Sequence, residues 1–155
     1  PWAVALLRAD EPNPLQAELC SGTIVRGEWV LTAAHCVYDE LGQPLEPGQL
    51  DIAVGASDLA TLRPQQRIRA SRVVVYPGYS PLEYGRDVAL VQLSRPSGIA
   101  PARLGVGSPG REGAWVAGFG LNDLGSTSLL TGSAPRGAAG RHTRASRPEL
   151  ARRPR

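Results

Sequence analysis

The chain has 155 residues, of which 42% are hydrophobic and 20% are charged, which suits one globular domain with an apolar core and excludes a wholly disordered chain. It contains no run of about 18 apolar residues, so the sequence excludes a membrane-spanning helix. The formal net charge is +3 and all 17 basic residues are arginine, but residues 132–155 carry +6 and the first 131 residues carry −3. The basic character therefore belongs to the C-terminal segment.

Short apolar segments separated by glycine and proline predict β-strands along most of the chain. The expected strands are Ala3–Leu7, Leu19–Val25, Trp29–Thr32, Gln49–Gly55, Gln66–Tyr76, Val88–Leu93 and Ala114–Leu121. Because no helical period of 3.6 residues is sustained, we expect an all-β sandwich or barrel. The first strand follows Pro1-Trp2 directly, with no signal peptide before it, so we expect the N-terminus to be a cut end.

The composition changes after the sixth expected strand. Residues 94–113 are rich in proline and glycine and predict a linker that crosses a surface. From Gly132 onward there is no Val, Ile, Phe, Trp or Tyr, so this segment cannot bury enough apolar surface to offset its ordering entropy. We expect a disordered arginine-rich tail, either solvated or the product of an incorrect gene model. The alternative, contact with nucleic acid or another polyanion, lacks the interleaved aromatic residues that such binding uses.

The two cysteines, Cys20 and Cys36, are separated by fifteen residues and lie near strands that could form a hairpin. A disulfide between them would stabilise the fold by about 3 kcal/mol and would indicate a secreted or periplasmic protein. The alternative is a pair of reduced, buried thiols. We expect no metal site, because the only histidines are His35 and His142, and His142 lies in the expected tail, so four zinc ligands cannot be gathered.

His35 and Asp87 are the candidate catalytic residues, although an isolated histidine beside an apolar run more often has a structural role. His35 follows the small residues Ala33 and Ala34, which leave room for a partner to approach the imidazole ring. Asp87 directly precedes the expected strand Val88–Leu93. This is an unusual place for an aspartate, because aspartate is rare in strands. It is either a turn residue that pairs with Arg86 or a buried carboxylate that accepts a hydrogen bond from the histidine ring and fixes its tautomer.

These segments resemble the chymotrypsin/trypsin-like serine proteases (peptidase family S1) over about residues 1–122. Thr32-Ala33-Ala34-His35-Cys36 closely resembles the family's histidine motif, and Asp87-Val88-Ala89-Leu90 resembles its aspartate motif, in the family's order. Cys20–Ile24 looks like the strand that supplies the bridging cysteine. Pro1–Leu6 looks like the start of the first barrel strand, and Gly118-Phe119-Gly120 like the Gly-Trp-Gly that begins the second barrel.

The resemblance implies a function and a domain organisation. His35 would be the general base of a serine-type endopeptidase, Asp87 would orient its ring, and Cys20 and Cys36 would form a disulfide beside it. Residues 1–95 would form the N-terminal barrel of the two-barrel fold, 96–113 a linker, 114–124 the first strand of the second barrel, and 125–155 the tail. The implied partners are peptide or protein substrates, with no cofactor and no membrane span, and nucleic acid is not expected.

The chain departs from the family in its C-terminal part. The family's nucleophile lies in a Gly-Asp-Ser-Gly-Gly motif that this sequence lacks, and Ser126, Ser128, Ser133 and Ser146 all stand in other settings. We therefore expect a truncated chain, a fragment or a misread gene product, that lacks the nucleophile and is inactive alone. The alternative is a non-catalytic pseudoprotease that serves as a binding module. Neither reading indicates an oligomeric state.

Overall fold

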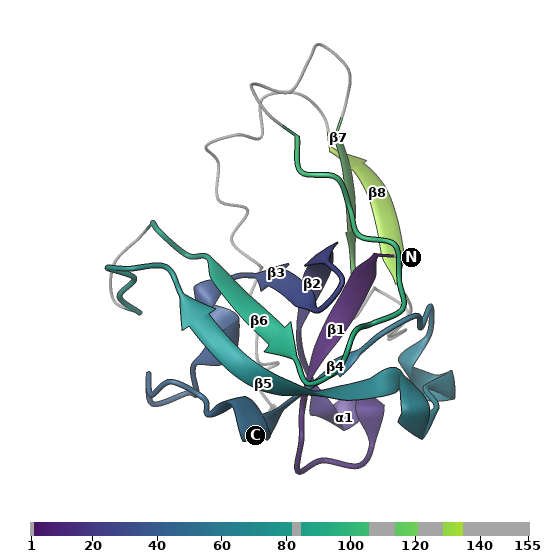
Figure 1. Cartoon of the computed structure of the whole chain (residues 1–155), viewed down its shortest axis with the longest axis horizontal. Coiled ribbons are helices and arrows are strands. Elements are labelled where there is room, and N and C mark those ends of the chain that lie inside the picture. The colour runs from purple at the N-terminus through teal and green to yellow at the C-terminus, as the bar shows by residue number, and fades with distance from the viewer. Residues whose placement is uncertain (1, 82–84, 106–113, 121–128, 135–155) are drawn as a thin grey trace, which may run out of the picture.

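The computed structural model describes residues 2–81, 85–105, 114–120 and 129–134 (Figure 1). Six antiparallel strands close into a barrel in the order β1-β2-β3-β6-β5-β4. They are β1 (Ala3–Arg8), β2 (Glu18–Arg26), β3 (Trp29–Thr32), β4 (Leu50–Ala53), β5 (Arg67–Val75) and β6 (Ala89–Leu93). The all-β class and the expected barrel are confirmed, and closure leaves no free sheet edge in it.

The order of the strands explains how distant segments meet. β1, β2 and β3 pair in chain order as two hairpins, and β6 then pairs with β3. β4 closes the barrel, since it pairs with both β1 and β5. The pairing of Thr32 with Ala89, at the end of β3 and the start of β6, brings the residues after β3 beside those before β6. This register determines which side chains share the candidate site.

Strand β1 is buried on both faces, which accounts for its continuous apolar sequence. Val4 and Leu6 belong to the core inside the barrel, whereas Ala5 and Leu7 belong to a second cluster outside it. The second cluster also contains Ala17, Ala53, Leu59 and Phe119. A strand that must bury both faces cannot alternate apolar and polar residues.

The described helices are single short turns in the connections between strands. They are α1 (Pro14–Ala17) and the 3-10 turns η1 (Ala34–Val37), η2 (Pro47–Gln49), η3 (Leu59–Thr61) and η4 (Pro64–Gln66). Asn13 caps α1 by accepting a hydrogen bond from the Leu15 N–H at 3.0 Å. None of the helices in the described ranges has the length or the apolar character to cross a membrane.

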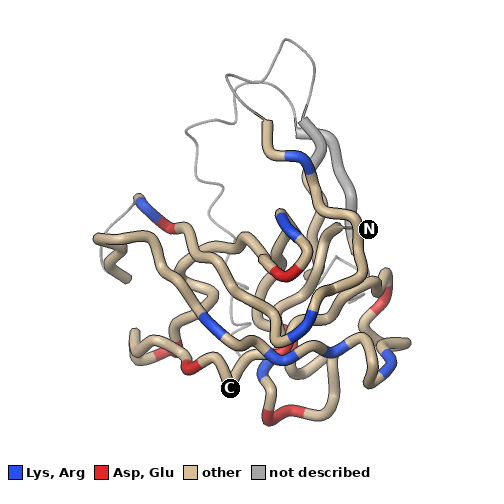
Figure 2. The backbone as a smooth tube through the Cα atoms, viewed as in Figure 1, with Lys and Arg blue, Asp and Glu red and all other residues tan. Residues whose placement is uncertain are grey.

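Both signs of charge are interspersed along the described backbone (Figure 2). Within it, Asp51 of β4 is a buried acid, and it pairs with two arginines of the neighbouring strand β5. Its carboxylate accepts from Arg67 Nε at 3.2 Å and from Arg69 Nε at 2.6 Å. Because residues two apart on a strand share a face, one carboxylate can serve both guanidinium groups. These pairs satisfy a charge that burial would otherwise destabilise.

Beyond the barrel, β7 (Ala114–Gly118) pairs with β8 (Leu130–Ala134) in a two-stranded antiparallel sheet (Figure 1). β7 lies where the first strand of a second barrel was expected. β8 is a correction, since residues 125–155 were expected to be tail throughout. Main-chain hydrogen bonds do not depend on large apolar side chains, and Leu129 packs on the outer cluster of β1. The expected tail residues 135–155, His142 and Ser146 included, lie outside the described residues.

Candidate active site

The turn η1 is buried on both sides of His35, which itself faces outward. Ala34 and Val37 are completely buried and Cys36 is 7% exposed, so the turn is fixed to the core. The His35 side chain keeps 62% of its exposure. A bulky residue in place of Ala34 would have no room in this core. The small residues of the motif thus present an exposed imidazole on a rigid turn.

Asp87 contacts His35 through both carboxylate oxygens. Its Oδ2 lies 2.8 Å from the ring Nδ1, and its Oδ1 accepts a hydrogen bond from the His35 backbone N–H at 2.9 Å. The two residues are 52 positions apart, and the pairing of β3 with β6 brings them together. An ionised carboxylate only accepts hydrogen bonds, so the ring places its proton on Nδ1 and leaves the lone pair on Nε2.

The electrostatics of Asp87 favour the ionised carboxylate. Burial acts to raise the Asp87 pKa, but the hydrogen bonds from the His35 ring and backbone outweigh it, and the pKa lies below its usual range. Burial raises the pKa of Tyr79, and the nearby Asp87 carboxylate raises it further. The Tyr79 ring packs on Tyr38 with 5.3 Å between the ring centroids. The expectation of a buried Asp87 is wrong for this chain, because the side chain is 42% exposed at the mouth of β6.

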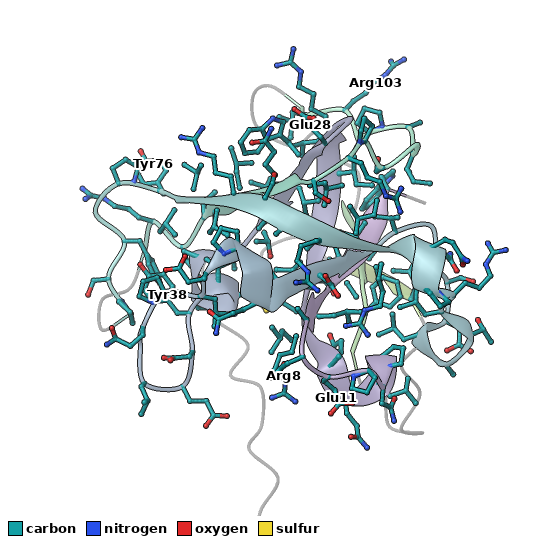
Figure 3. All side chains as sticks on the ribbon, turned by 60° about the horizontal axis from the view of Figure 1, so that its bottom comes forward. Arg8, Glu11, Glu28, Tyr38, Tyr76 and Arg103 are labelled. Atoms are coloured by element: carbon teal, nitrogen blue, oxygen red, sulfur yellow. A yellow bond between two sulfur atoms is a disulfide. The ribbon has the colours of Figure 1, made fainter. Side chains whose placement is uncertain are left out.

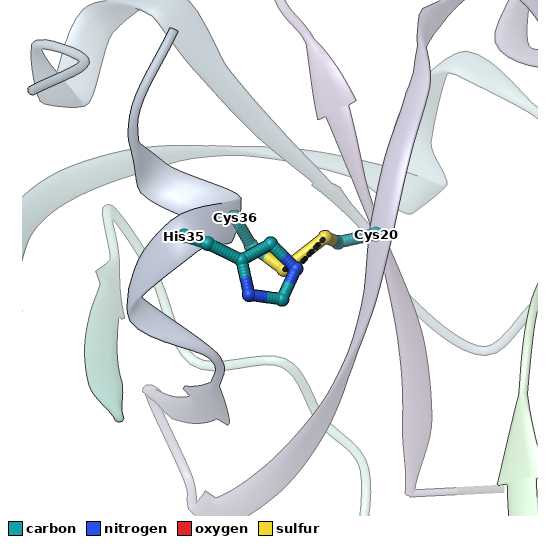
Figure 4. A group of neighbouring side chains, drawn as sticks. All are labelled: Cys20, His35 and Cys36. Carbon is teal, nitrogen blue, oxygen red and sulfur yellow. Dashed lines mark hydrogen bonds between the residues drawn. A yellow bond between two sulfur atoms is a disulfide. The ribbon is translucent and has the colours of Figure 1, made fainter. Parts of the chain in front are cut away.

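A disulfide joins Cys20 of β2 to Cys36 of η1, with 5.9 Å between their Cα atoms. Both cysteines of the chain are thereby bonded, so the alternative of two reduced thiols does not describe this structure. The imidazole lies against the two sulfurs, with His35 Nε2 3.9 Å from Cys20 Sγ and 3.4 Å from Cys36 Sγ (Figure 4). A disulfide sulfur carries no hydrogen to donate, so with the ring proton on Nδ1 these are van der Waals contacts.

Ser21 is a site-supporting residue that the motif analysis did not single out. Its hydroxyl accepts a hydrogen bond from the Phe119 N–H at 2.6 Å and lies 3.1 Å from the Phe119 carbonyl oxygen, to which it can donate. The Ser21 carbonyl also accepts from Thr32 Oγ1 at 2.9 Å. One residue thus links the segment after β7 to strand β2, which carries Cys20, and to strand β3, which leads into the turn that carries His35. Its position directly after Cys20 in the resembling segment was the only sequence signal.

The candidate nucleophiles have no described setting. Ser126, Ser128 and Ser146 lie outside the described residues, and Ser133 is described only as a backbone position of β8. An open cavity of about 620 Å³ lies between the loops that follow β1 and η1. Leu19 and Tyr38 line it together with charged residues of both signs, and Arg8 and Tyr38 are labelled in Figure 3.

Comparison with known proteins gives consistent results. The sequence matches the family model described as Trypsin over residues 1–145. It is 36% identical to human Kallikrein-14 over 103 residues, which is 66% of this chain and 34% of that protein. It is 31% identical to the venom peptide isomerase heavy chain of Agelenopsis aperta over 98 residues, 62% of this chain and 38% of that one.

A solved structure shows the same architecture. The VesB protease of Vibrio cholerae superposes with a TM-score of 0.65 at 27% identity, and the match covers 86% of this chain and 40% of that one. The chain therefore spans well under half the length of the curated relatives and of the solved structure that it matches.

Proposed function

Because the chain belongs to the trypsin family, we propose that it forms the histidine- and aspartate-bearing part of a serine endopeptidase. Such an enzyme cleaves peptide bonds by acyl transfer to a serine hydroxyl. The observation that carries the proposal is the two-point contact of Asp87 with His35, at 2.8 and 2.9 Å. This contact leaves the Nε2 lone pair of an exposed imidazole free to take a proton.

Each residue has a defined role in this chemistry. His35 takes the proton of the nucleophile through Nε2 and later gives it to the leaving amine. Asp87 holds the ring in the required tautomer and stabilises the imidazolium that forms when the proton arrives. The disulfide between Cys20 and Cys36 holds the turn that carries His35 against strand β2. The disulfide also supports the proposal that the protein is secreted, since such bonds persist in oxidising compartments.

We assign the nucleophile to no serine of this chain. None of the serines near its C-terminus stands in a Gly-Asp-Ser-Gly-Gly setting, and the matched relatives extend well beyond the length that this chain covers. Loss of a triad nucleophile costs on the order of a millionfold in turnover. We therefore propose that the 155 residues alone have no peptidase activity and that the active protein supplies a serine outside them.

The test uses a fluorophosphonate probe, which labels only an activated serine. The gene product from its natural source should be labelled and should be larger than 16.4 kDa, whereas the purified 155-residue chain should stay unlabelled. In the full gene product, His35→Ala should abolish labelling and Asp39→Asn, a control in the neighbouring loop, should not. An unlabelled natural protein of 16.4 kDa would instead favour the non-catalytic binding module.

A further inference from the structure

The residue before Asp87 has an unusual backbone conformation. Arg86 has a φ of 54°, and it is the one non-glycine residue in the described ranges with a positive φ. Residues with a Cβ seldom adopt this left-handed region, and asparagine and aspartate tolerate it better than arginine does. Such a conformation persists only where the surrounding contacts hold it. The contacts of Arg86 therefore identify what holds it here.

The backbone contacts of Arg86 set the position of Asp87. The Arg86 carbonyl accepts a hydrogen bond from the Val88 N–H at 2.8 Å, which closes a three-residue turn centred on Asp87. The Val88 carbonyl accepts from the Tyr76 N–H at 2.9 Å, which joins this turn to the residue after β5. Asp87 therefore reaches His35 from a turn that begins at the left-handed residue. A different φ at Arg86 would redirect the carboxylate.

The side chain of Arg86 lies over Gly78. A Cβ added at Gly78 would overlap Arg86 Nη1 and would lie 3.6 Å from Arg86 Cζ and 3.8 Å from Arg86 Cδ. Gly78 has a φ of 80° and belongs to a turn that begins at Tyr76 (Figure 3), whose carbonyl accepts from the Tyr79 N–H at 3.1 Å. Pro77 at the second position and glycine at the third are typical of a type II turn. The missing side chain at Gly78 leaves the space that the guanidinium occupies.

The same turn also contacts the histidine side of the site. The Tyr79 ring packs on the Tyr38 ring, with 5.3 Å between centroids. The Tyr38 N–H donates to the His35 carbonyl at 3.3 Å at the end of η1. Contacts therefore run from Arg86 through the turn to Tyr38 and η1, and from Arg86 through the backbone to Asp87. The two routes meet at the hydrogen bonds between Asp87 and His35.

We propose that Arg86 is a positioning residue for the pair of His35 and Asp87. Its guanidinium, which lies over Gly78, holds the left-handed backbone that directs the Asp87 carboxylate toward the histidine ring. Arg86 acts through Asp87 and needs no contact with a substrate. The positioning concerns the described residues alone, whereas its consequence for catalysis rests on the proposed function.

The tautomer of His35 measures this positioning in the 155-residue chain without an enzymatic assay. Arg86→Ala removes the guanidinium but leaves a Cβ at the left-handed position, so the backbone should relax and the carboxylate should move away from Nδ1. In ¹⁵N NMR the ring should shift from the tautomer protonated on Nδ1 toward the one protonated on Nε2. Arg86→Asn should keep the wild-type ring shifts, because asparagine tolerates left-handed backbone without a guanidinium. Arg86 is exposed, so both variants should fold.

Matched controls separate this route from loss of charge and from backbone strain. Arg72→Ala removes another exposed arginine, on β5, and should leave the ring shifts unchanged. Gly78→Ala and Gly98→Ala each place a Cβ at a positive φ, 80° and 71°, but at Gly98 that Cβ would meet nothing within 4 Å, whereas at Gly78 it would displace Arg86. Gly78→Ala should therefore disturb the His35 ring, and Gly98→Ala should not.

The catalytic consequence is measured in the active gene product. Arg86→Ala should lower kcat on the order of 10-fold with little change in KM, since Asp87 stabilises a charge that forms only during the reaction. A misplacement of about 1 Å can cost about 100-fold, and an exposed residue that acts through another should cost less. Arg86→Asn should restore most of the lost turnover.

Three results would overturn the proposal. The first is a set of native His35 ring shifts in Arg86→Ala. The second is equal disturbance of the ring by Arg86→Ala and Arg86→Asn, which would assign the effect to the guanidinium charge. The third is an equal effect of Gly78→Ala and Gly98→Ala. None of these results would alter the proposed function, which the serine probe tests separately. Conversely, the expected ring shifts in a chain whose natural gene product escapes the serine probe would support the positioning and contradict the proposed function.

Discussion

Asp87 holds His35 at two points, with Oδ1 on the backbone N–H and Oδ2 on the ring Nδ1. A single one of these hydrogen bonds would leave either the ring or the backbone of the turn free to move. Together they fix the turn, the ring plane and the tautomer with a single carboxylate. The pairing of β3 with β6 sets this geometry, so the site depends on the barrel register as much as on the motif residues.

Asp87→Asn should reverse the tautomer of His35. If the amide oxygen keeps the backbone N–H of His35, the amide NH₂ group faces Nδ1, which must then accept, and the ring proton moves to Nε2. The ring nitrogen shifts in ¹⁵N NMR of the purified chain measure this directly. In an active gene product the wrong tautomer should lower turnover on the order of 10⁴-fold.

Asp39→Asn is the matched control for this prediction. Asp39 Oδ1 accepts backbone hydrogen bonds from Leu41 and Gln43 in the loop after η1. It should leave the His35 ring shifts unchanged. Identical ring shifts in the wild type and Asp87→Asn would show that the carboxylate does not select the tautomer.

Acid should weaken the folded state through Asp87. Burial acts to raise the pKa of this carboxyl, but the hydrogen bonds from His35 lower it below the unfolded value of about 3.9. The native state then binds fewer protons than the unfolded state, so this stabilisation is complete above about pH 4 and is lost as the pH falls through the folded pKa.

Urea unfolding at a series of pH values measures this effect. Below about pH 4 the free energy of unfolding of the wild type should fall more steeply than that of Asp87→Asn, which carries no titrating group there. The difference should be modest because the carboxylate is 42% exposed. Parallel profiles for the two proteins would contradict the lowered pKa.

Removal of the disulfide should cost about 3 kcal/mol of unfolding free energy. The bridge spans a sequence separation of 16, and a closed loop of about that length restricts the unfolded chain by this amount in the entropy model. The double variant Cys20→Ala/Cys36→Ala should show the loss in urea unfolding. Wild type reduced by a phosphine should unfold at a similar denaturant concentration. A loss below about 1 kcal/mol would show that the bridge constrains little.

The sequence predicted the strands and the motif residues because both depend on local patterns. Short apolar segments bounded by turn residues located β1 to β6 within a few positions. The His35 and Asp87 motifs were found because their residues, and the order in which they occur, resemble those of a known family. β1 was recognised despite its two buried faces because it is short and bounded by turn residues. Local pattern is therefore enough to locate the six strands of the barrel.

Contacts between distant strands could not be predicted in the same way. The Ser21–Phe119 hydrogen bonds join residues 98 positions apart, and the pairing of Asp51 with Arg67 and Arg69 depends on the register of β4 against β5. No single segment encodes these relationships. The exposure of Asp87 likewise depends on what surrounds the start of β6, not on the apolar run that follows it.

Gly22→Ala should destabilise the barrel by about 1–3 kcal/mol through overpacking. Gly22 pairs with Val4 across the β1–β2 hairpin. An added Cβ would lie 2.7 Å from Val30 Cγ1, 3.1 Å from Leu6 Cδ1 and 3.2 Å from the Leu31 carbonyl oxygen. The Leu31 oxygen is backbone and cannot move aside without shifting β3, so rotation of the valine alone does not relieve the crowding.

Gly27→Ala provides the matched control, because a Cβ there meets nothing within 4 Å. Its unfolding free energy should stay within about 0.5 kcal/mol of the wild type. The midpoint of urea unfolding should fall for Gly22→Ala alone, with an unchanged slope. Since β2 carries Cys20 and β3 leads into η1, separating them should also disturb the His35 ring resonances. A stable Gly22→Ala variant with native ring resonances would show that β2 and β3 adjust without moving the site.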